Sequence, residues 1–272
     1  MRVGINSKAL KQFNGDGLVS LRTALVDVVE LSLAEVDFLE LGDKIVEHAL
    51  RVKDIYKIDY TIHAPYQDSE VKYLRVDFGR RDPAVLEIMD EVFNIAHEVE
   101  ADTVVIHAGD MHNGKSFENA VNNIRDVAKI ASDYGIKLAV ENIYTNEIGI
   151  KRLAELPEEM LRLIEEVAMD NVGVNLDVGH AYISAMLHNR SLLEWFELLK
   201  DYIIHMHVHN NFGINGIPWD KHLPLDFGRI NYIKLEKYIN ADNVILEVKR
   251  GSGRSIINSL EFLKCKKSAL IC

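Results

Sequence analysis

The chain has 272 residues, of which 48% are hydrophobic, so it can form one large core or two small ones. Its formal net charge of −11 argues against a protein that binds nucleic acid mainly by electrostatic attraction. No apolar run approaches the ~20 residues that a membrane-spanning helix needs, and the N-terminus lacks a signal-peptide core. We expect no membrane partner, and the two cysteines, Cys265 and Cys272, fit a reducing cytoplasm.

Short apolar runs alternate with longer amphipathic runs along the whole chain. The short runs predict strands at residues 2–6, 37–42, 60–65, 103–108, 137–142, 173–177, 203–210 and 244–249. The longer runs have apolar residues at helical spacing and predict helices at residues 20–34, 44–56, 83–99, 117–134, 157–167, 183–200, 232–239 and 254–263.

Eight strand–helix units follow one another without a flexible linker, which predicts a single domain over residues 1–272. Parallel strands separated by helices at this chain length most economically close into a (β/α)8 TIM barrel. An open, doubly wound sheet is the structural alternative. The segment 4–7 after the first predicted strand, G-I-N-S, has no glycine-rich phosphate loop, so a nucleotide-binding site is poorly supported.

The predicted strand at 203–210 carries three histidines at alternate positions. Side chains two residues apart in a strand share a face, so His205, His207 and His209 point the same way and the intervening apolar residues point the other way. Three imidazoles on one face are costly to bury without partners. Since neutral imidazole is the commonest metal ligand, this strand predicts a divalent-metal site.

In a barrel, functional side chains lie at the carboxyl ends of the strands. From the third predicted strand onward, each strand end or the loop after it carries a histidine or carboxylate, namely His63, His107, Glu141, Asp177, His180, His207, Asp220, His222 and Glu247. Three carboxylates and one imidazole, from Glu141, Asp177, His207 and Glu247, suit Mn²⁺, Mg²⁺, Co²⁺ or Zn²⁺. All nine are too many for one ion and enough for two or three, unless some orient ligands or bind substrate.

The strand ends also form a recognisable series of motifs: H-A-P-Y, V-I-H-A-G, V-E-N, L-D-V-G-H-A, H-M-H-V-H-N, D-K-H-L-P-L and I-L-E-V. The series, which spans nearly the whole chain, resembles the xylose-isomerase-like TIM-barrel superfamily of sugar isomerases, sugar epimerases and endonuclease IV-type enzymes. The resemblance to the epimerases implies one metal on Glu141, Asp177, His207 and Glu247. The resemblance to endonuclease IV implies three zinc ions on these four and on His63, His107, His180, Asp220 and His222.

The surroundings of these motifs depart from the nuclease pattern. Q-D-S-E follows Tyr66, the segment after Asp177 reads V-G-H, and H-N-N-F follows Val208. The nuclease's ligand types are retained while the segments that contact DNA in that enzyme are not. The resemblance therefore leans toward the sugar isomerases and epimerases.

Two chemistries follow from the resemblance. In the first, an isomerase or epimerase of a sugar, sugar phosphate or polyol uses one ion, Zn²⁺ or Mn²⁺, to stabilise an ene-diolate while Glu141 and Glu247 pass the proton. His180 takes part in catalysis, and the expected substrate-binding residues are His63, His107, His180 and Arg229. In the alternative, two or three Zn²⁺ ions cleave DNA at abasic sites, with His63 and His107 as additional ligands. The oligomeric state stays open.

Overall fold

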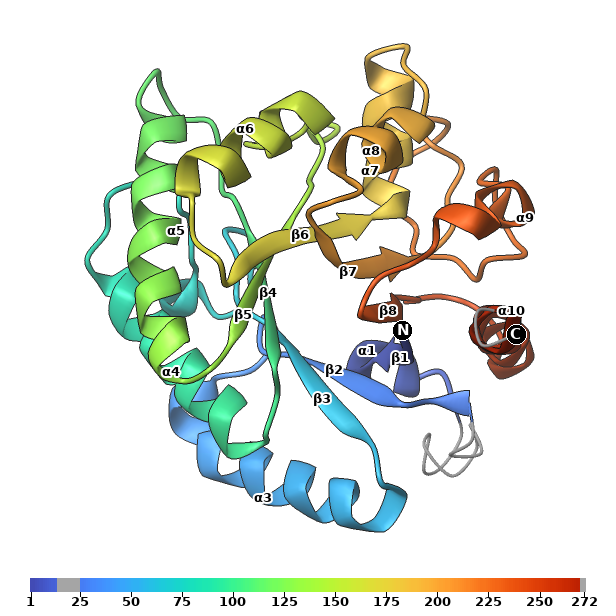
Figure 1. Ribbon diagram of the computed structural model, residues 1–272, viewed down its shortest axis with the longest axis horizontal. Coiled ribbons are helices and arrows are strands. Elements are labelled where there is room, and N and C mark those ends of the chain that lie inside the picture. Colours follow the sequence, from blue (N-terminus) through green and yellow to red (C-terminus); the bar gives the residue numbers. More distant parts are fainter. Residues whose placement is uncertain (14–24, 270–272) are drawn as a thin grey trace.

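The protein is built on eight parallel strands that close into a barrel in sequence order, as seen in the computed structural model, which describes residues 1–13 and 25–269 (Figure 1). The strands are β1 (Arg2–Asn6), β2 (Val28–Ser32), β3 (Asp59–His63), β4 (Thr103–His107), β5 (Lys137–Glu141), β6 (Val172–Asp177), β7 (Ile203–Val208) and β8 (Asn243–Leu246). β8 pairs with β1, with Val244 opposite Val3, and this pairing closes the barrel. The predicted (β/α)8 architecture is confirmed, and the open sheet is wrong.

Helices cover the outside of the barrel (Figure 1). They are α1 (Ser7–Leu10), α3 (Phe38–Tyr56), α4 (Ala84–Glu98), α5 (Ser116–Asp133), α6 (Pro157–Val167), α7 (Val178–Leu187), α8 (Leu193–Leu199), α9 (Tyr232–Leu235) and α10 (Gly253–Ala269), with short 3-10 turns η2 (Lys72–Leu74) and η3 (Glu236–Tyr238). Within the described ranges, no helix is both long and apolar enough to cross a bilayer. Cys265 is an exposed free thiol on α10, and Cys272 lies outside the described residues.

Two predictions near the N-terminus are wrong. The segment 37–42, predicted as a strand, begins α3, because Asp37 caps this helix by accepting the backbone N–H of Glu40 (3.4 Å). The second strand is instead β2, at residues 28–32, inside the region 20–34 that was predicted as a helix. Residues 20–24 of that predicted helix lie outside the described residues. The predicted helix 183–200 is divided into α7 and α8.

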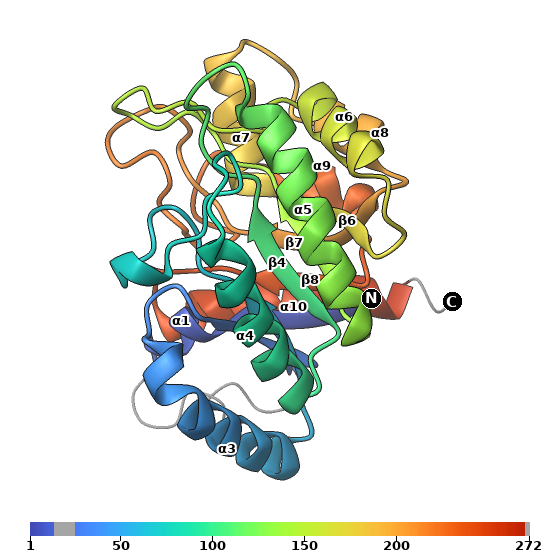
Figure 2. The same ribbon diagram turned by 90° about the vertical axis from the view of Figure 1, so that its left-hand side faces the viewer.

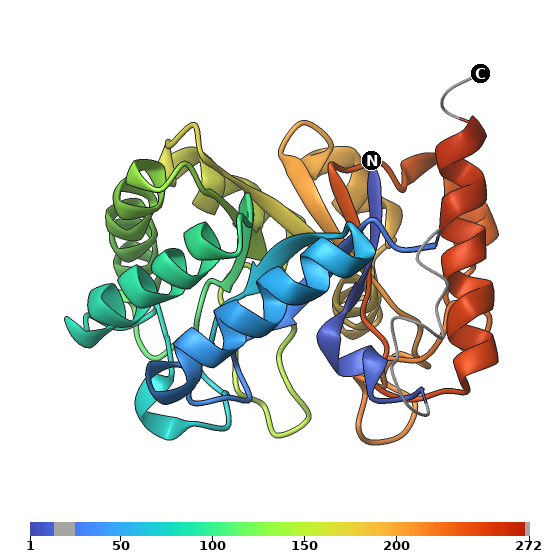
Figure 3. The same ribbon diagram turned by 90° about the horizontal axis from the view of Figure 1, so that it is seen from below.

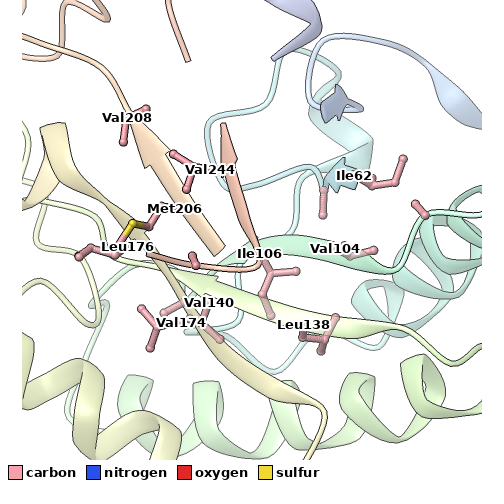
Figure 4. Packing of buried hydrophobic residues seen from close by; sticks show 14 of the residues in the cluster. Ile62, Val104, Ile106, Leu138, Val140, Val174, Leu176, Met206, Val208 and Val244 are labelled. Atoms are coloured by element: carbon pink, nitrogen blue, oxygen red, sulfur yellow. The ribbon is translucent and has the colours of Figure 1, made fainter. Parts of the chain in front are cut away.

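Toward their carboxyl ends, the strands alternate between an apolar outer face and a polar inner face. In β6, Val174 and Leu176 are fully buried in the layer between strands and helices. Figure 4 shows the corresponding outward residues of the neighbouring strands, from Ile62 in β3 to Val244 in β8. The alternate residues, Asn175 and Asp177, instead face other strand residues inside the barrel, so the barrel interior is available for a polar site.

The long loops that follow the strands gather at one end of the barrel, on the left in Figure 2 and at the bottom in Figure 3. The N-terminus and the C-terminal end of α10 lie at the opposite end (Figure 2). At that opposite end the interior is tightly filled. A Cβ added to Gly4 of β1 would lie 2.5 Å from the carbonyl oxygen of Val28 and 2.6 Å from Cδ1 of Ile245. Any open space is therefore at the loop end, where a TIM barrel carries its active site.

The close packing of Gly4 against Val28 and Ile245 leads to a testable prediction. Gly4→Ala should lower the free energy of unfolding by about 1–3 kcal/mol, because the added methyl group would push β1 away from β2 and β8. The matched control is Gly114→Ala, where a Cβ would meet nothing within 4 Å, and where the change should stay within about 0.5 kcal/mol. Chemical denaturation of both variants checks this; equal stabilities would contradict the tight packing.

Candidate metal centre

Three of the predicted ligands converge on a ring nitrogen of a fourth, Nδ1 of His207. The Glu141 Oε2 lies 3.1 Å from this nitrogen, the Glu247 Oε2 lies 3.3 Å from it, and the Asp177 Oδ2 lies 3.8 Å from it. The side chains come from the carboxyl ends of β5, β6 and β7 and from the residue after β8. His207 and Asp177 are fully buried, and Glu141 and Glu247 are nearly so, which leaves the three carboxylates little contact with water. We call these four residues the inner cluster.

Two further histidines extend the inner cluster on one side. The Nε2 atoms of His63 and His107, at the ends of β3 and β4, each lie 3.5 Å from a carboxylate oxygen of Glu141. Both rings are buried. With Glu141 they form the side cluster, which shares one carboxylate with the inner cluster, so a ligand at either position affects the other.

An outer cluster lies nearer the loops and consists of His180, His209, Asp220 and His222. Asp220 Oδ2 lies 2.5 Å from Nε2 of His222 and 3.6 Å from Nε2 of His180, and its Oδ1 lies 3.7 Å from Nε2 of His209. Three of these residues were predicted from sequence as ligands, whereas His209 was predicted only to lie on the histidine face of the strand. All nine predicted ligands are thus brought to one end of the barrel.

The segment D-V-G-H at 177–180 shows how local sequence positions the site. Asp177 ends β6 and caps α7, with its Oδ1 accepting the backbone N–H of His180 at 2.7 Å. Its second oxygen is left to face His207. A Cβ added to Gly179 would lie 2.0 Å from the ring of His209, so only glycine lets His209 approach Asp177, with its Nε2 3.1 Å from Oδ1.

Glu30 of β2 is a site residue that the sequence analysis missed. Its Oε2 lies 3.1 Å from Nε2 of His205 and 3.0 Å from Nε2 of His207, and its Oε1 accepts the side-chain amide of Asn6 at 2.9 Å. A carboxylate accepts hydrogen bonds, so it holds a proton on Nε2 of His207 and leaves Nδ1 with a free lone pair toward the inner cluster. Glu30 was missed because residues 28–32 were predicted as part of a helix. The signal in the sequence that could have identified it is a single Glu within the short apolar run V-V-E-L.

The chemistry of the inner cluster fits a bound cation. Within residues 1–13 and 25–269, Nδ1 of His207, Oδ2 of Asp177 and both ring nitrogens of His107 are buried and make no hydrogen bond. Burial by itself would raise the pKa of Glu141, but His207 and His107 hold it well below its usual range. Burial would lower the pKa of His207, yet Glu30 and Glu141 raise it well above its usual range. The three carboxylates are therefore stabilised by positive charge beside them. A divalent ion bound to Nδ1 of His207 would supply that charge in place of a proton on this nitrogen.

A cavity of about 280 Å³ opens above the clusters, and its walls include Lys8, Tyr66, Tyr144 and Lys249. Its size is near the lower limit of the ~300–1,000 Å³ typical of small-molecule sites. The loops over it are tied together where Glu147 accepts the backbone N–H of Trp219 at 2.6 Å.

Arg229 is not part of this cavity. Its side chain is exposed and lines a separate hollow that includes Asn231 of the same loop and Phe262 of α10. The structure therefore does not bring this expected substrate-binding residue to the other candidates.

Comparison with known proteins agrees with this geometry. Residues 22–265 match the family described as xylose isomerase-like TIM barrel. The chain belongs to this family. That confirms the resemblance seen in the strand-end motifs.

Two proteins of known sequence are similar to this chain. It is 28% identical over 233 residues to the protein named "Uncharacterized protein MJ1311" of Methanocaldococcus jannaschii, covering 82% of this chain and 75% of that one. An inosose isomerase of Halalkalibacterium halodurans is 29% identical over 113 residues, or 42% of this chain and 38% of that one.

Solved structures extend the comparison. A D-tagatose 3-epimerase-like protein superposes with a TM-score of 0.76 at 26% identity, covering 99% of this chain and 98% of that one. A D-psicose 3-epimerase from Clostridium cellulolyticum H10, solved with D-tagatose, has a TM-score of 0.71 at 16% identity over 97% of this chain and 99% of that one. At 16% identity the second likeness shows the shared fold alone.

The buried contacts of Glu30 can be tested without any ligand. In the presence of a chelator, Glu30→Gln should lower the free energy of unfolding by about 1–3 kcal/mol, because the amide cannot accept from both histidines and from Asn6 without leaving a buried group unpaired. Glu35→Gln is the control: Glu35 pairs with Lys8 (3.1 Å) and Lys11 (3.3 Å) near the surface, and its loss should cost at most about 1 kcal/mol. Equal losses would contradict the role given to Glu30.

Proposed function

We propose that the protein is a divalent-metal-dependent isomerase or epimerase of a small sugar, sugar phosphate or polyol. The observation that carries this proposal is the convergence of Glu141, Asp177 and Glu247 on Nδ1 of His207 beneath a cavity of about 280 Å³. Three carboxylates and one imidazole suit Mn²⁺ or Zn²⁺. When bound, such an ion would stabilise negative charge that develops on oxygens of the substrate.

The similar proteins support this substrate class. The D-tagatose 3-epimerase-like protein and the inosose isomerase are both named for polyhydroxy carbonyl compounds. The cavity walls suit such a ligand, because hydroxyl-bearing Tyr66 and Tyr144 lie beside buried histidines. Tyr66 is stacked on the ring of His107, with centroids 4.4 Å apart, and provides a flat side to the cavity.

Glu141 and Glu247 are the proposed proton-transfer groups. Both carboxylates line the cavity, and both lie within 3.3 Å of the same ring nitrogen of His207, so they flank a substrate held there. Glu141 is the more firmly held, since Oε2 accepts the side-chain amide of Asn175 at 2.8 Å. A proton removed on one side of a carbon by one carboxylate can be returned on the other side by the second.

His180 is positioned to assist from the loop side. Its Nδ1 lies 3.1 Å from the carbonyl oxygen of Asn142, which can only accept a hydrogen bond, so Nδ1 carries the proton. Its Nε2 then faces Asp220 and the cavity. We propose that His180, His63 and His107 bind substrate oxygens, and we leave Arg229 out of this set because of its position.

Isotope exchange tests the proposal. The protein, loaded with Mn²⁺ or Zn²⁺, is incubated with ketohexoses and inososes in D₂O, and NMR follows deuterium incorporation next to the carbonyl. Glu141→Gln and Glu247→Gln should each slow exchange by ~10²–10⁴-fold, because each removes a proton-transfer group. The control Glu165→Gln lies on the exposed face of α6 and should leave exchange unchanged. Exchange that persists in both site variants would exclude the proposed roles.

A second candidate is an endonuclease IV-like zinc phosphodiesterase that acts at abasic sites. The specific observation in its favour is the division of the nine predicted ligands into inner, side and outer clusters, which suits several ions. The arginine that lines the cavity, Arg152, argues against it, because its charge is already paired with Asp110 and, at 2.6 Å, with Asp68.

A nicking assay separates the two candidates. The zinc-loaded protein is incubated with a duplex that contains one abasic site, at low salt to favour binding. We expect no cleavage above that of the Glu247→Gln variant. Cleavage by the wild type that Glu247→Gln abolishes would replace the isomerase proposal with the nuclease.

A further inference from the structure

The outer cluster contains a cation of its own, which sets it apart from the inner cluster. The Nζ atom of Lys249 lies 2.7 Å from Nε2 of His222 and 4.0 Å from Oδ2 of Asp220. Within the described part of the chain, no lysine or arginine nitrogen lies within 4.0 Å of the carboxylates of Glu141, Asp177 or Glu247. The inner carboxylates thus have only histidines as basic groups beside them, whereas Asp220 also has a lysine.

The hydrogen bonds of His222 determine what its second nitrogen can do. Nδ1 lies 2.9 Å from the carbonyl oxygen of Glu247, and because a carbonyl only accepts, Nδ1 carries the ring proton. Nε2 of the neutral ring then has a free lone pair. An ammonium group only donates, so Lys249 donates to this lone pair. A lone pair that accepts this hydrogen bond is not available to a metal ion.

The backbone holds Lys249 at this position. The backbone N–H of Lys249 donates to the carbonyl oxygen of His222 at 3.0 Å, while Nδ1 of His222 donates to the carbonyl oxygen of Glu247. These two bonds join the segment after β8 to the loop before α9. The side chain of Lys249 is 40% exposed and lines the cavity above the clusters.

The lysine and the aspartate meet at the same ring nitrogen. Oδ2 of Asp220 lies 2.5 Å from Nε2 of His222, and Nζ of Lys249 lies 2.7 Å from it. At 4.0 Å from Oδ2, the ammonium group also provides a positive charge to the carboxylate. At His222 and Asp220 the ammonium group thus has the electrostatic role that a metal ion would have there.

We propose that the ammonium group of Lys249 takes the place of a metal ion in the outer cluster, so that zinc binds the inner and side clusters but not the outer one. This proposal rests on the proposed function, which places a metal ion at the inner cluster. It favours the isomerase or epimerase over the nuclease, because a site with Lys249 in this position lacks the third zinc ion that the resemblance to the nuclease implies. It also places a fixed positive charge beside the substrate cavity, which Lys249 lines.

Zinc counting in wild type and His222→Gln gives the first test. Each protein is equilibrated with chelator-buffered Zn²⁺ and desalted, and bound zinc per chain is measured by elemental analysis. The two counts should be equal, because His222 is not a ligand while Lys249 is present. A count in His222→Gln that is lower by one ion would overturn the proposal.

Removing the lysine gives the second test. Lys249→Met should bind one more zinc ion per chain than wild type, because Nε2 of His222 and Asp220 become free. The double variant Lys249→Met/His222→Gln should return to the wild-type count. Lys249→Arg keeps the charge and should not gain an ion. Lys8→Met is the matched control: Lys8 lines the same cavity but pairs with Glu35, and its loss should leave the count unchanged.

The outcomes separate this proposal from the proposed function. An unchanged count in folded Lys249→Met overturns the role of Lys249. A wild-type count of zero overturns metal binding at the inner cluster, while a gain of one ion in Lys249→Met would still support the role of the lysine. If circular dichroism shows that Lys249→Met does not fold, the comparison of wild type with His222→Gln decides.

Discussion

Three carboxylates buried around one imidazole nitrogen are the constraint on which this structure depends. Glu141, Asp177 and Glu247 lie together within 3.8 Å of Nδ1 of His207. The free energy needed to move an unpaired carboxylate out of water is far larger than the free energy gained from one hydrogen bond. A folded protein of this size is stable by only about 5–15 kcal/mol, so such a group has to be compensated. We therefore expect folding and cation binding to be coupled in this barrel.

The compensation is arranged in layers along the barrel axis. Beneath the inner cluster, Glu30 sets the proton of His207 on Nε2 and turns the lone pair of Nδ1 toward the carboxylates. Above it, Lys249 provides a positive charge to Asp220. The middle layer has only histidine protons, which a divalent ion would displace. In the proposed chemistry, Glu141 and Glu247 contact the substrate in this layer. The carboxylates that lack a lysine or arginine partner are therefore also the proposed proton-transfer groups.

The elements that sequence predicted best are those with a strong and local signal. β1 and the six strands from β3 to β8 were predicted within a few residues, because each is a short segment whose outward residues are apolar and which is separated from the next by a longer amphipathic segment. The error around β2 has a local cause: V-V-E-L is short and follows an apolar stretch with helical spacing. Asp37 and Glu40 have the spacing of a helix N-cap, and this signal would have predicted a helix start in place of the strand expected at residues 37–42.

The order of residue types along the chain determined the barrel, its open end and the nine ligand candidates, because strand and helix periodicity are local properties. Only the tertiary structure decided how those candidates are grouped. It divided them into three clusters, added Glu30 and His209, moved Arg229 to a different hollow and put Lys249 against His222. The physical reason is that distances between side chains on different strands depend on barrel closure and register, which no single segment encodes.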